Sequence, residues 1–314
     1  MLEQSQSFWR LRDLRFVLFR SPELARDKIM HRVVVTGIGV VAPNGIGREN
    51  FWNACVNGLS GVRPITSFDA SGHPVKIAAE VPDFDLAPYV PAAHRKSLKI
   101  MGRAARFTVA AAGLAVEDSG LQLSRENPEA VGVVMGTGIV PVDLPEVTPL
   151  LSRAWGEDGT LHTDHLGRQG PQSLFPLWLL KYLPNMTAAH VSLIHNAQGP
   201  NSTITTACAA GTQAVGEAFR LIARGDAEIM LAGGGDSRVD PLLMLAYSAL
   251  GALSPANKPA GEVSRPFDAQ RDGFVLGEGA GVLVLEELER AKRRGATIYA
   301  EVMGLGTSFD AYAV

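Results

Sequence analysis

An α/β fold with a largely parallel, buried sheet is the architecture that this sequence predicts. Two observations favour it: several short, mainly apolar or β-branched runs have the length of strands, and they alternate with longer stretches of helical periodicity. The strand candidates, in chain order, are Val33–Val35, Val131–Met135, Thr203–Thr206, Ile229–Leu231 and Val282–Leu285. A length of 314 residues with 46% hydrophobic and 19% charged residues suits a packed globular protein of one large or two ordinary domains.

The first strand candidate marks the start of the folded domain. Met30 is followed directly by His31–Gly37, an apolar run that ends in a tight turn. Residues 1–29 form an N-terminal extension, interpreted as an amphipathic appendage or, the favoured alternative, as upstream sequence from a misplaced start codon. Its segment Trp9–Phe19 interleaves charges with apolar residues, so it lacks the continuous apolar core of a secretory signal.

Helical periodicity is clearest in three segments. Arg103–Asp118 has alanines and valines at helical spacing and ends near Gly120, and Gly211–Arg224 places its apolar residues on one face. Glu286–Gly295 carries acids at its front, bases at its back and a glycine stop, as the helix dipole favours. A further strand is expected at Ile298–Val302.

The stretch Ile139–Pro184 breaks the alternation of strands and helices. It contains several prolines and glycines together with aromatic residues. Because long irregular connections in compact α/β domains are often binding loops or lids, we interpret it as an insertion that covers a pocket or builds a subunit contact.

Composition excludes several classes of protein. A net charge of −3 gives no excess of basic residues for binding nucleic acid. The two cysteines, Cys55 and Cys208, are too few for a disulfide framework and suit a reducing compartment, so we expect a cytoplasmic protein. No stretch approaches the roughly 20 apolar residues that span a bilayer, so no membrane span is expected.

Cys208 is the strongest candidate for a catalytic residue. It lies where a β-branched run gives way to the small residues that begin an amphipathic helix, so its thiol should sit at a strand-to-helix turn. The amide groups and dipole of the helix favour the reactive thiolate, and the N–H of Cys208 could stabilise an oxyanion. Cys55 lies inside an apolar helical pattern and is interpreted as an ordinary buried thiol.

Five motifs occur here in the order seen in the β-ketoacyl-acyl-carrier-protein synthases. They are Gly199–Asn201, Thr206–Gly211, Leu231–Gly234, Arg265–Asp268 and Arg271–Gly281. The chain resembles this family from about His31 to its C-terminus, most closely the elongating synthase II branch, and the likeness weakens across the insertion. Five motifs in register make the resemblance specific.

The resemblance implies a thiolase-like, layered αβαβα fold of two similar halves, each a mixed sheet flanked by helices. Residues 30–286 would form the N-terminal ketoacyl synthase domain, and residues 287–314 the beginning of an incomplete C-terminal one. Incompleteness would expose apolar surface that is normally buried between the halves. The family also suggests a homodimer joined through strands near Cys208.

The activity that the resemblance implies is a 3-oxoacyl-[acyl-carrier-protein] synthase reaction in fatty acid or polyketide-like biosynthesis. Cys208 would take an acyl group from acyl carrier protein as a thioester, and malonyl-carrier protein would then lose CO₂ and attack it. No cofactor is implied. The family's two catalytic histidines lie downstream of the segment resembling Gly304–Ala311, so Cys208 alone is carried over as catalytic. The alternatives are a non-condensing acyl-carrier-binding partner and an inactive truncated remnant.

A basic cluster is the candidate docking site for the acidic carrier protein. Arg95, Lys96 and Lys99, with Arg103 nearby, precede or begin a helix in a slightly acidic chain. Such a run is usually only a solvated face, but the corresponding region in the family resembles a carrier-docking site, where long-range attraction raises the encounter rate.

The remaining polar motifs favour structural roles. His162–His165 lacks metal partners at ligand spacing and suits a solvated loop, so no metal site is expected, and His190 and His195 suit packing or hydrogen bonding. Gly37–Ala42 imitates a dinucleotide fingerprint, but the following proline breaks the helix that pyrophosphate needs. Arg271, Asp272 and Glu278 are interpreted as an ion-pair network that shapes the loop beside the nucleophile.

Overall fold

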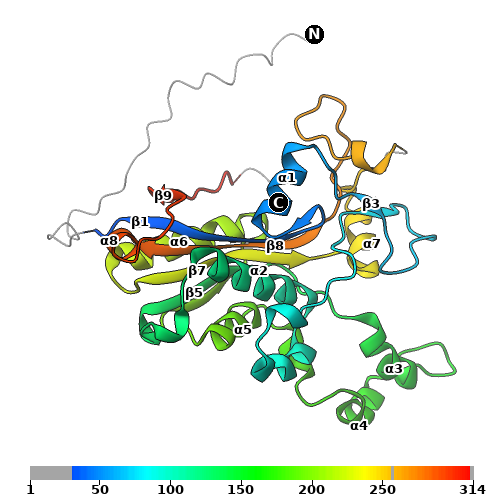
Figure 1. The fold of residues 1–314 in the computed structure, drawn as a ribbon. Helices are drawn as coiled ribbons and strands as arrows, with labels where there is room; N and C mark the ends of the chain where they lie inside the picture. The colour runs from blue at the N-terminus through cyan, green and yellow to red at the C-terminus, as the bar shows by residue number, and fades with distance from the viewer. Residues whose placement is uncertain (1–29, 256–257, 312–314) are drawn as a thin grey trace. The chain divides into compact units, whose positions relative to one another are not determined.

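The computed structural model describes residues 30–255 and 258–311, so the prediction about residues 1–29 lies outside the described part. These residues form a seven-stranded sheet covered by helices (Figure 1). The strands of this sheet are β1 (Val33–Ala42), β2 (Gly45–Ile46), β5 (Val131–Gly136), β6 (Asn201–Ile204), β7 (Ile229–Ser237), β8 (Glu278–Glu287) and β9 (Ala300–Val302). Their order is β2-β1-β8-β7-β5-β6, with β9 also paired to β1, and β3 (Arg63–Pro64) pairs with β4 (Ile77–Ala78) separately.

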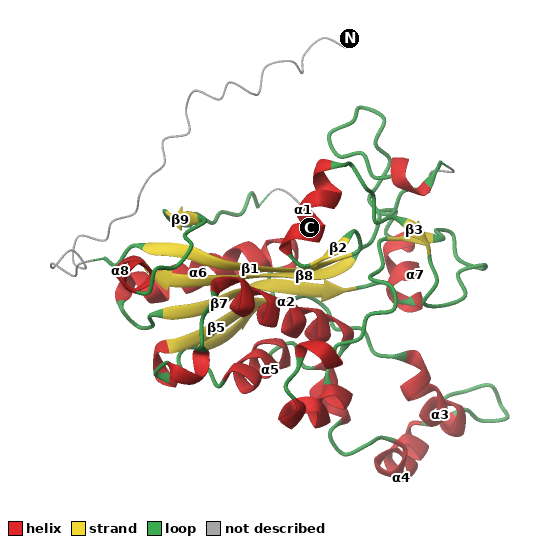
Figure 2. Cartoon of the chain, in the orientation of Figure 1, coloured by secondary structure: helices red, strands yellow, loops and turns green. Residues whose placement is uncertain are grey.

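Helices cover both faces of the sheet. They are α1 (Arg48–Val56), α2 (Arg103–Ser119), α3 (Leu144–Ala154), α4 (Thr163–Ser173), α5 (Met186–His195), α6 (Ala210–Arg224), α7 (Pro241–Ala249) and α8 (Leu288–Arg293). Figure 2 shows α2 and α5 together below the strands, and Val133 of β5 packs in the core cluster that they share. Its neighbour Val134 packs instead with Ala214 and Ile222 of α6. Alternate residues of one strand therefore serve two apolar layers, which confirms the α/β prediction.

The strand directions correct the expectation of a largely parallel sheet. β5 runs parallel to β6 and β7, whereas β8 runs antiparallel to both β1 and β7. The sheet is mixed, as the family resemblance implies. Every residue of β5 is buried, as its apolar sequence predicts. An all-apolar strand indicates that both of its faces are covered, but it does not indicate whether the strand runs parallel or antiparallel to its neighbours.

The two long helices form where they were expected. α2 and α6 each end at a glycine in the left-handed region, Gly120 at φ 68° and Gly225 at φ 81°. Glycine adopts this conformation without strain, so it ends a helix cleanly.

The glycines of β1 allow a helix to pack closely against the strand, which explains them without a dinucleotide-binding site. Gly37 and Gly39 lie inside a continuous strand. A Cβ on Gly39 would come within 1.9 Å of the carbonyl oxygen of Ala111 in α2, and one on Gly37 within 2.2 Å of that of Ala115. The missing side chains therefore let α2 press against the strand.

The insertion is more regular than expected. α3, α4 and the 3₁₀ helix Trp178–Tyr182 occupy most of it, so the prediction of an irregular segment is wrong in that respect. Glu146 of α3 binds the 3₁₀ helix: it accepts hydrogen bonds from Trp178 Nε1 at 3.0 Å and from the Tyr182 hydroxyl at 2.6 Å, and it pairs with Lys181. A role as a lid or a subunit contact stays a prediction.

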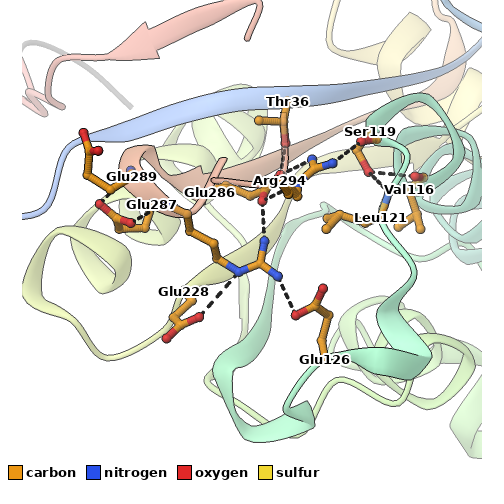
Figure 3. Close-up of polar contacts among 11 residues, drawn as sticks. Thr36, Val116, Ser119, Leu121, Glu126, Glu228, Glu286, Glu287, Glu289 and Arg294 are labelled. Atoms are coloured by element: carbon orange, nitrogen blue, oxygen red, sulfur yellow. Dashed lines mark hydrogen bonds and ion pairs between the residues drawn. The ribbon is translucent and has the colours of Figure 1, made fainter. Parts of the chain in front are cut away.

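A buried ion-pair network joins α8 to the sheet (Figure 3). Glu286 is fully buried and accepts hydrogen bonds from Thr36 of β1, from Arg290 and from Arg294. Arg290 also reaches Glu126 at 2.5 Å. The network connects β1, β8, α8 and the loop after α2.

The last described elements differ from expectation only in their bounds. β8 continues to Glu287, so α8 is shorter than the predicted helix, and the Glu287 carboxylate caps it by accepting from the N–H groups of Glu289 and Arg290. β9 pairs with β1. The assignment of residues 287–314 to a second domain stays a prediction. Within the described ranges, no helix combines the length and apolarity that crossing a bilayer requires.

Candidate active site

Cys208 lies in the connection between β6 and α6. A short 3₁₀ turn, Ala207–Ala209, joins the end of the strand to the first residue of the helix, and the cysteine is exposed. The predicted strand-to-helix turn is confirmed. Its catalytic role and the use of its N–H as an oxyanion donor stay predictions.

The turn that presents Cys208 is strained. Ala207, the residue before it, has φ 50°, in the left-handed region where a side chain costs on the order of 1 kcal/mol. Three hydrogen bonds brace the turn. The N–H of Ala209 donates to the carbonyl of Thr206 at 3.2 Å, the N–H of Ala210 donates to the carbonyl of Ala207, and the Thr206 hydroxyl donates to Gln213 Oε1 at 2.6 Å. The strained backbone is therefore tied to the first turn of α6.

A cavity of about 820 Å³ opens beside Cys208. It is lined by the start of α6, by Thr137 and by the glycine-rich parts of β7 and β8. A Cβ on Gly136 would come within 2.4 Å of the α6 backbone at Ala210, so the glycine at the end of β5 allows the helix start to approach the sheet. Small residues thus create both the close contact and the space beside the thiol.

Glu278 lines this cavity, and both oxygens of its carboxylate accept hydrogen bonds. Arg103 binds it in a bidentate fashion, at 2.5 and 2.7 Å, and it also accepts from the Ser237 hydroxyl at 2.7 Å and the Val81 N–H at 2.8 Å. These four hydrogen bonds fix the carboxylate in place, so it shapes the wall of the cavity. Sequence reasoning missed this pair, because Arg103 was grouped with the basic cluster.

The predicted network of Arg271, Asp272 and Glu278 is wrong as a single set. Asp272 accepts from Ser254 and Arg265, and the Arg271 guanidinium donates to the backbone carbonyl of Asp268. Each of the three therefore has its own partners.

None of the described histidines lines the cavity beside Cys208. His162 lies 3.2 Å from Asp158 and stacks against His165, with ring centroids 5.3 Å apart. His190 is buried, in keeping with a packing role, and burial lowers its pKa. Burial, helped by the charge of His94, lowers the pKa of His195 to about 4. In the described part of the chain, no three His, Cys, Asp or Glu side chains gather as metal ligands would.

The basic cluster and the second cysteine are both exposed. Arg95, Lys96 and Lys99 lie in the 3₁₀ helix Ala92–Ile100, just before α2, and make no ion pair with any described residue. They do not line the cavity beside Cys208. Cys55 is exposed on α1, so the expectation of a buried thiol is wrong. Ala54 is the one buried residue of this helix.

Comparison with known proteins relates this geometry to characterised sequences. Residues 30–291 match the family described as "Beta-ketoacyl synthase, N-terminal domain". The chain is 43% identical to 3-oxoacyl-[acyl-carrier-protein] synthase 2 of Coxiella burnetii and 42% identical to that of Vibrio harveyi, in each case over 90% of this chain and 64% of the relative. It thus spans less than two thirds of the length of these relatives.

The solved structures agree with the sequence matches. One is the AntDE:AntF complex of a type II polyketide acyl-carrier protein with its ketosynthase bound to the hexaketide; the TM-score is 0.74 at 34% identity, covering 90% of this chain and 64% of that one. This likeness confirms the thiolase-like α/β fold class for the N-terminal portion.

Proposed function

The chain belongs to the β-ketoacyl synthase family, and from that premise we propose that it performs the acyl-transfer step of a 3-oxoacyl-[acyl-carrier-protein] synthase at Cys208. The observation that carries the proposal is the exposed thiol at the tip of the β6–α6 turn, beside a cavity of about 820 Å³. A cavity of this size accommodates the acyl chain of a thioester substrate.

The proposed first step is a thioester exchange. Cys208 Sγ attacks the carbonyl carbon of the acyl-carrier thioester, a new S–C bond forms, the carrier S–C bond breaks, and the carrier thiol leaves with the proton that Cys208 gives up. In the condensation that follows, malonyl-carrier protein loses CO₂, the resulting carbanion attacks the acyl carbonyl carbon, and the S–C bond breaks to release Cys208 as a thiolate, which takes up a proton from solvent. Covalent capture divides the reaction into two easier steps.

Intact-mass measurement tests the acyl transfer. After incubation with acyl-carrier protein, the purified chain should gain the mass of one acyl group, and Cys208→Ala should gain none. Cys55→Ser is the matched control, because it removes the other exposed thiol and should leave the adduct unchanged. An unmodified wild-type chain, folded by circular dichroism, would contradict the proposal and favour the inactive remnant.

We further propose that acyl carrier protein docks at Arg95, Lys96 and Lys99. Three exposed cations without ion-pair partners among the described residues are free to meet an acidic partner, and such pairs mainly raise the association rate. The AntDE:AntF complex supports a carrier protein as the partner class.

Charge reversal tests this docking site. Lys96→Glu with Lys99→Glu should weaken carrier-protein binding about ten-fold at low salt and less at high salt, because screening shortens the reach of the charges. Arg125→Glu changes an exposed cation beyond the far end of α2 and should leave the affinity unchanged. Equal losses in both variants would point to a general charge effect and contradict a localised site.

We also propose that the protein is a cytoplasmic homodimer. β6 is the last strand of the sheet, so its outer edge, beside Cys208, is open to a second copy. An open strand edge readily pairs with another strand. The carbonyls of Pro200 and Ile204 accept from β5, so the even-numbered residues of β6 face that strand and the N–H of Thr203 faces the open edge. Thr203→Pro removes that N–H and should then yield a monomer in light-scattering measurements, and a wild-type monomer would contradict the proposal.

A further inference from the structure

Gln213 of α6 is connected to the residue that precedes the nucleophile turn. Its Oε1 accepts a hydrogen bond of 2.6 Å from the hydroxyl of Thr206, seven residues earlier in the chain. Cys208 lies between the two. The bond therefore spans the turn and joins its loop side to its helix side.

The helix side of this bond is firmly held. Ala214, the next residue, is fully buried and packs with Ile222 in the core cluster between α6 and the sheet. Gln213 is half-buried beside it. The acceptor thus stands on a rigid element, as an anchor requires.

The loop side needs such an anchor. Thr206, Ala207 and Cys208 are exposed, so packing does not hold them. Ala207 has φ 50°, and a non-glycine residue stays in the left-handed region only where its surroundings enforce it. Two backbone bonds, from Ala209 to Thr206 and from Ala210 to Ala207, lie within the turn, and the side-chain bond to Gln213 is the restraint that ties the turn to α6.

We propose that Gln213 is a positioning residue, acting through Thr206, that holds the Cys208 turn in the conformation from which the thiol attacks the acyl thioester. This inference rests on the proposed acyl transfer to Cys208. Gln213 is not itself required to touch the substrate. Its contribution is to keep the thiol aligned, and small misplacements of a reacting group slow reaction strongly.

The test uses variants that remove the bond with little change of shape. Gln213→Met keeps the length of the side chain without an acceptor, and Thr206→Val keeps the branching without a hydroxyl. Each should lower the first-order rate of Cys208 acylation about three- to ten-fold, in line with the loss of one hydrogen bond, with KM for acyl-carrier protein unchanged. The double variant should be no slower than either single one, because both remove the same bond.

Rescue and control variants separate positioning from general stability. Thr206→Ser retains the hydroxyl and should acylate at the wild-type rate. Gln122→Met makes the same exchange at an exposed position after α2 and should have no effect. Amide hydrogen exchange should be faster across residues 205–209 in Gln213→Met and Thr206→Val than in Thr206→Ser.

The outcomes distinguish this inference from the proposed function. If the wild-type chain is acylated and Gln213→Met is acylated equally fast, the positioning role is wrong and the proposed function stands. The positioning role is also wrong if the single losses add in the double variant. If the wild-type chain takes up no acyl group while the exchange pattern appears as expected, the bond holds the turn but the proposed function, and with it the positioning role, is wrong.

Discussion

Glu286→Gln should lower the free energy of unfolding more than the removal of any other single charge in the ion pairs described above. Its carboxylate is fully buried, and it accepts 2.6 Å and 3.0 Å hydrogen bonds from Arg290 and Arg294 in addition to the Thr36 hydroxyl. Glutamine preserves the shape but removes the charge and points an N–H₂ group at the guanidinium groups. Two largely buried cations then lose their anion.

The expected magnitude follows from these contacts. Arg290 and Arg294 donate three hydrogen bonds to the carboxylate, and the one oxygen of a glutamine amide can keep at least one of them. A hydrogen bond to a charged group contributes about 1.5–3 kcal/mol, so the loss of about two gives a range of about 3–6 kcal/mol. Arg290 retains Glu126, and Arg294 retains the carbonyl of Ser119, which favours the lower end. We expect a loss of about 3 kcal/mol, the usual scale for breaking a buried pair.

Urea unfolding followed by circular dichroism measures this loss. With a slope of about 3 kcal/mol per M, the midpoint should fall by about 1 M. The matched control is Glu289→Gln in α8: Glu289 is exposed, and Lys292 is its one ion-pair partner among the described residues, so its removal should leave the midpoint unchanged. Equal midpoints for Glu286→Gln and Glu289→Gln would refute the view that this network stabilises the fold.

Two further predictions concern packing and pH. Gly39→Ala should destabilise the fold by about 3 kcal/mol or more, since its Cβ would meet the Ala111 carbonyl at 1.9 Å, whereas Gly72→Ala, with open space around it, should be neutral in the same urea assay. Because the pKa of His195 is about 4 in the folded state and about 6.5 when unfolded, the unfolded chain binds the proton first, so stability should fall as pH is lowered from 6.5 towards 4. His195→Gln should flatten that dependence in unfolding midpoints measured at pH 5 and pH 7, and an unchanged slope would contradict the burial of this histidine.

The sequence was informative wherever structure depends on neighbouring residues. α2 and α6 were located to within one residue at each end, because their periodicity and their terminal glycines are local signals. The turn at Cys208 was found for the same reason: a β-branched run, then small residues, then an amphipathic helix. The family likeness rests on the same local motifs.

Only the tertiary structure decided how these pieces meet. The direction of β8, the bond from Arg103 to Glu278 across 175 positions and the exposure of Cys55 had no local signal. The helices of the insertion were missed because its prolines and glycines interrupt the helical periodicity of the sequence. Contacts between distant residues, such as that of Glu146 with Tyr182, stabilise these helices instead. The physical reason is that periodicity and capping depend on residues a few positions apart, whereas strand order and ion-pair partners depend on contacts that the chain makes only once it has folded.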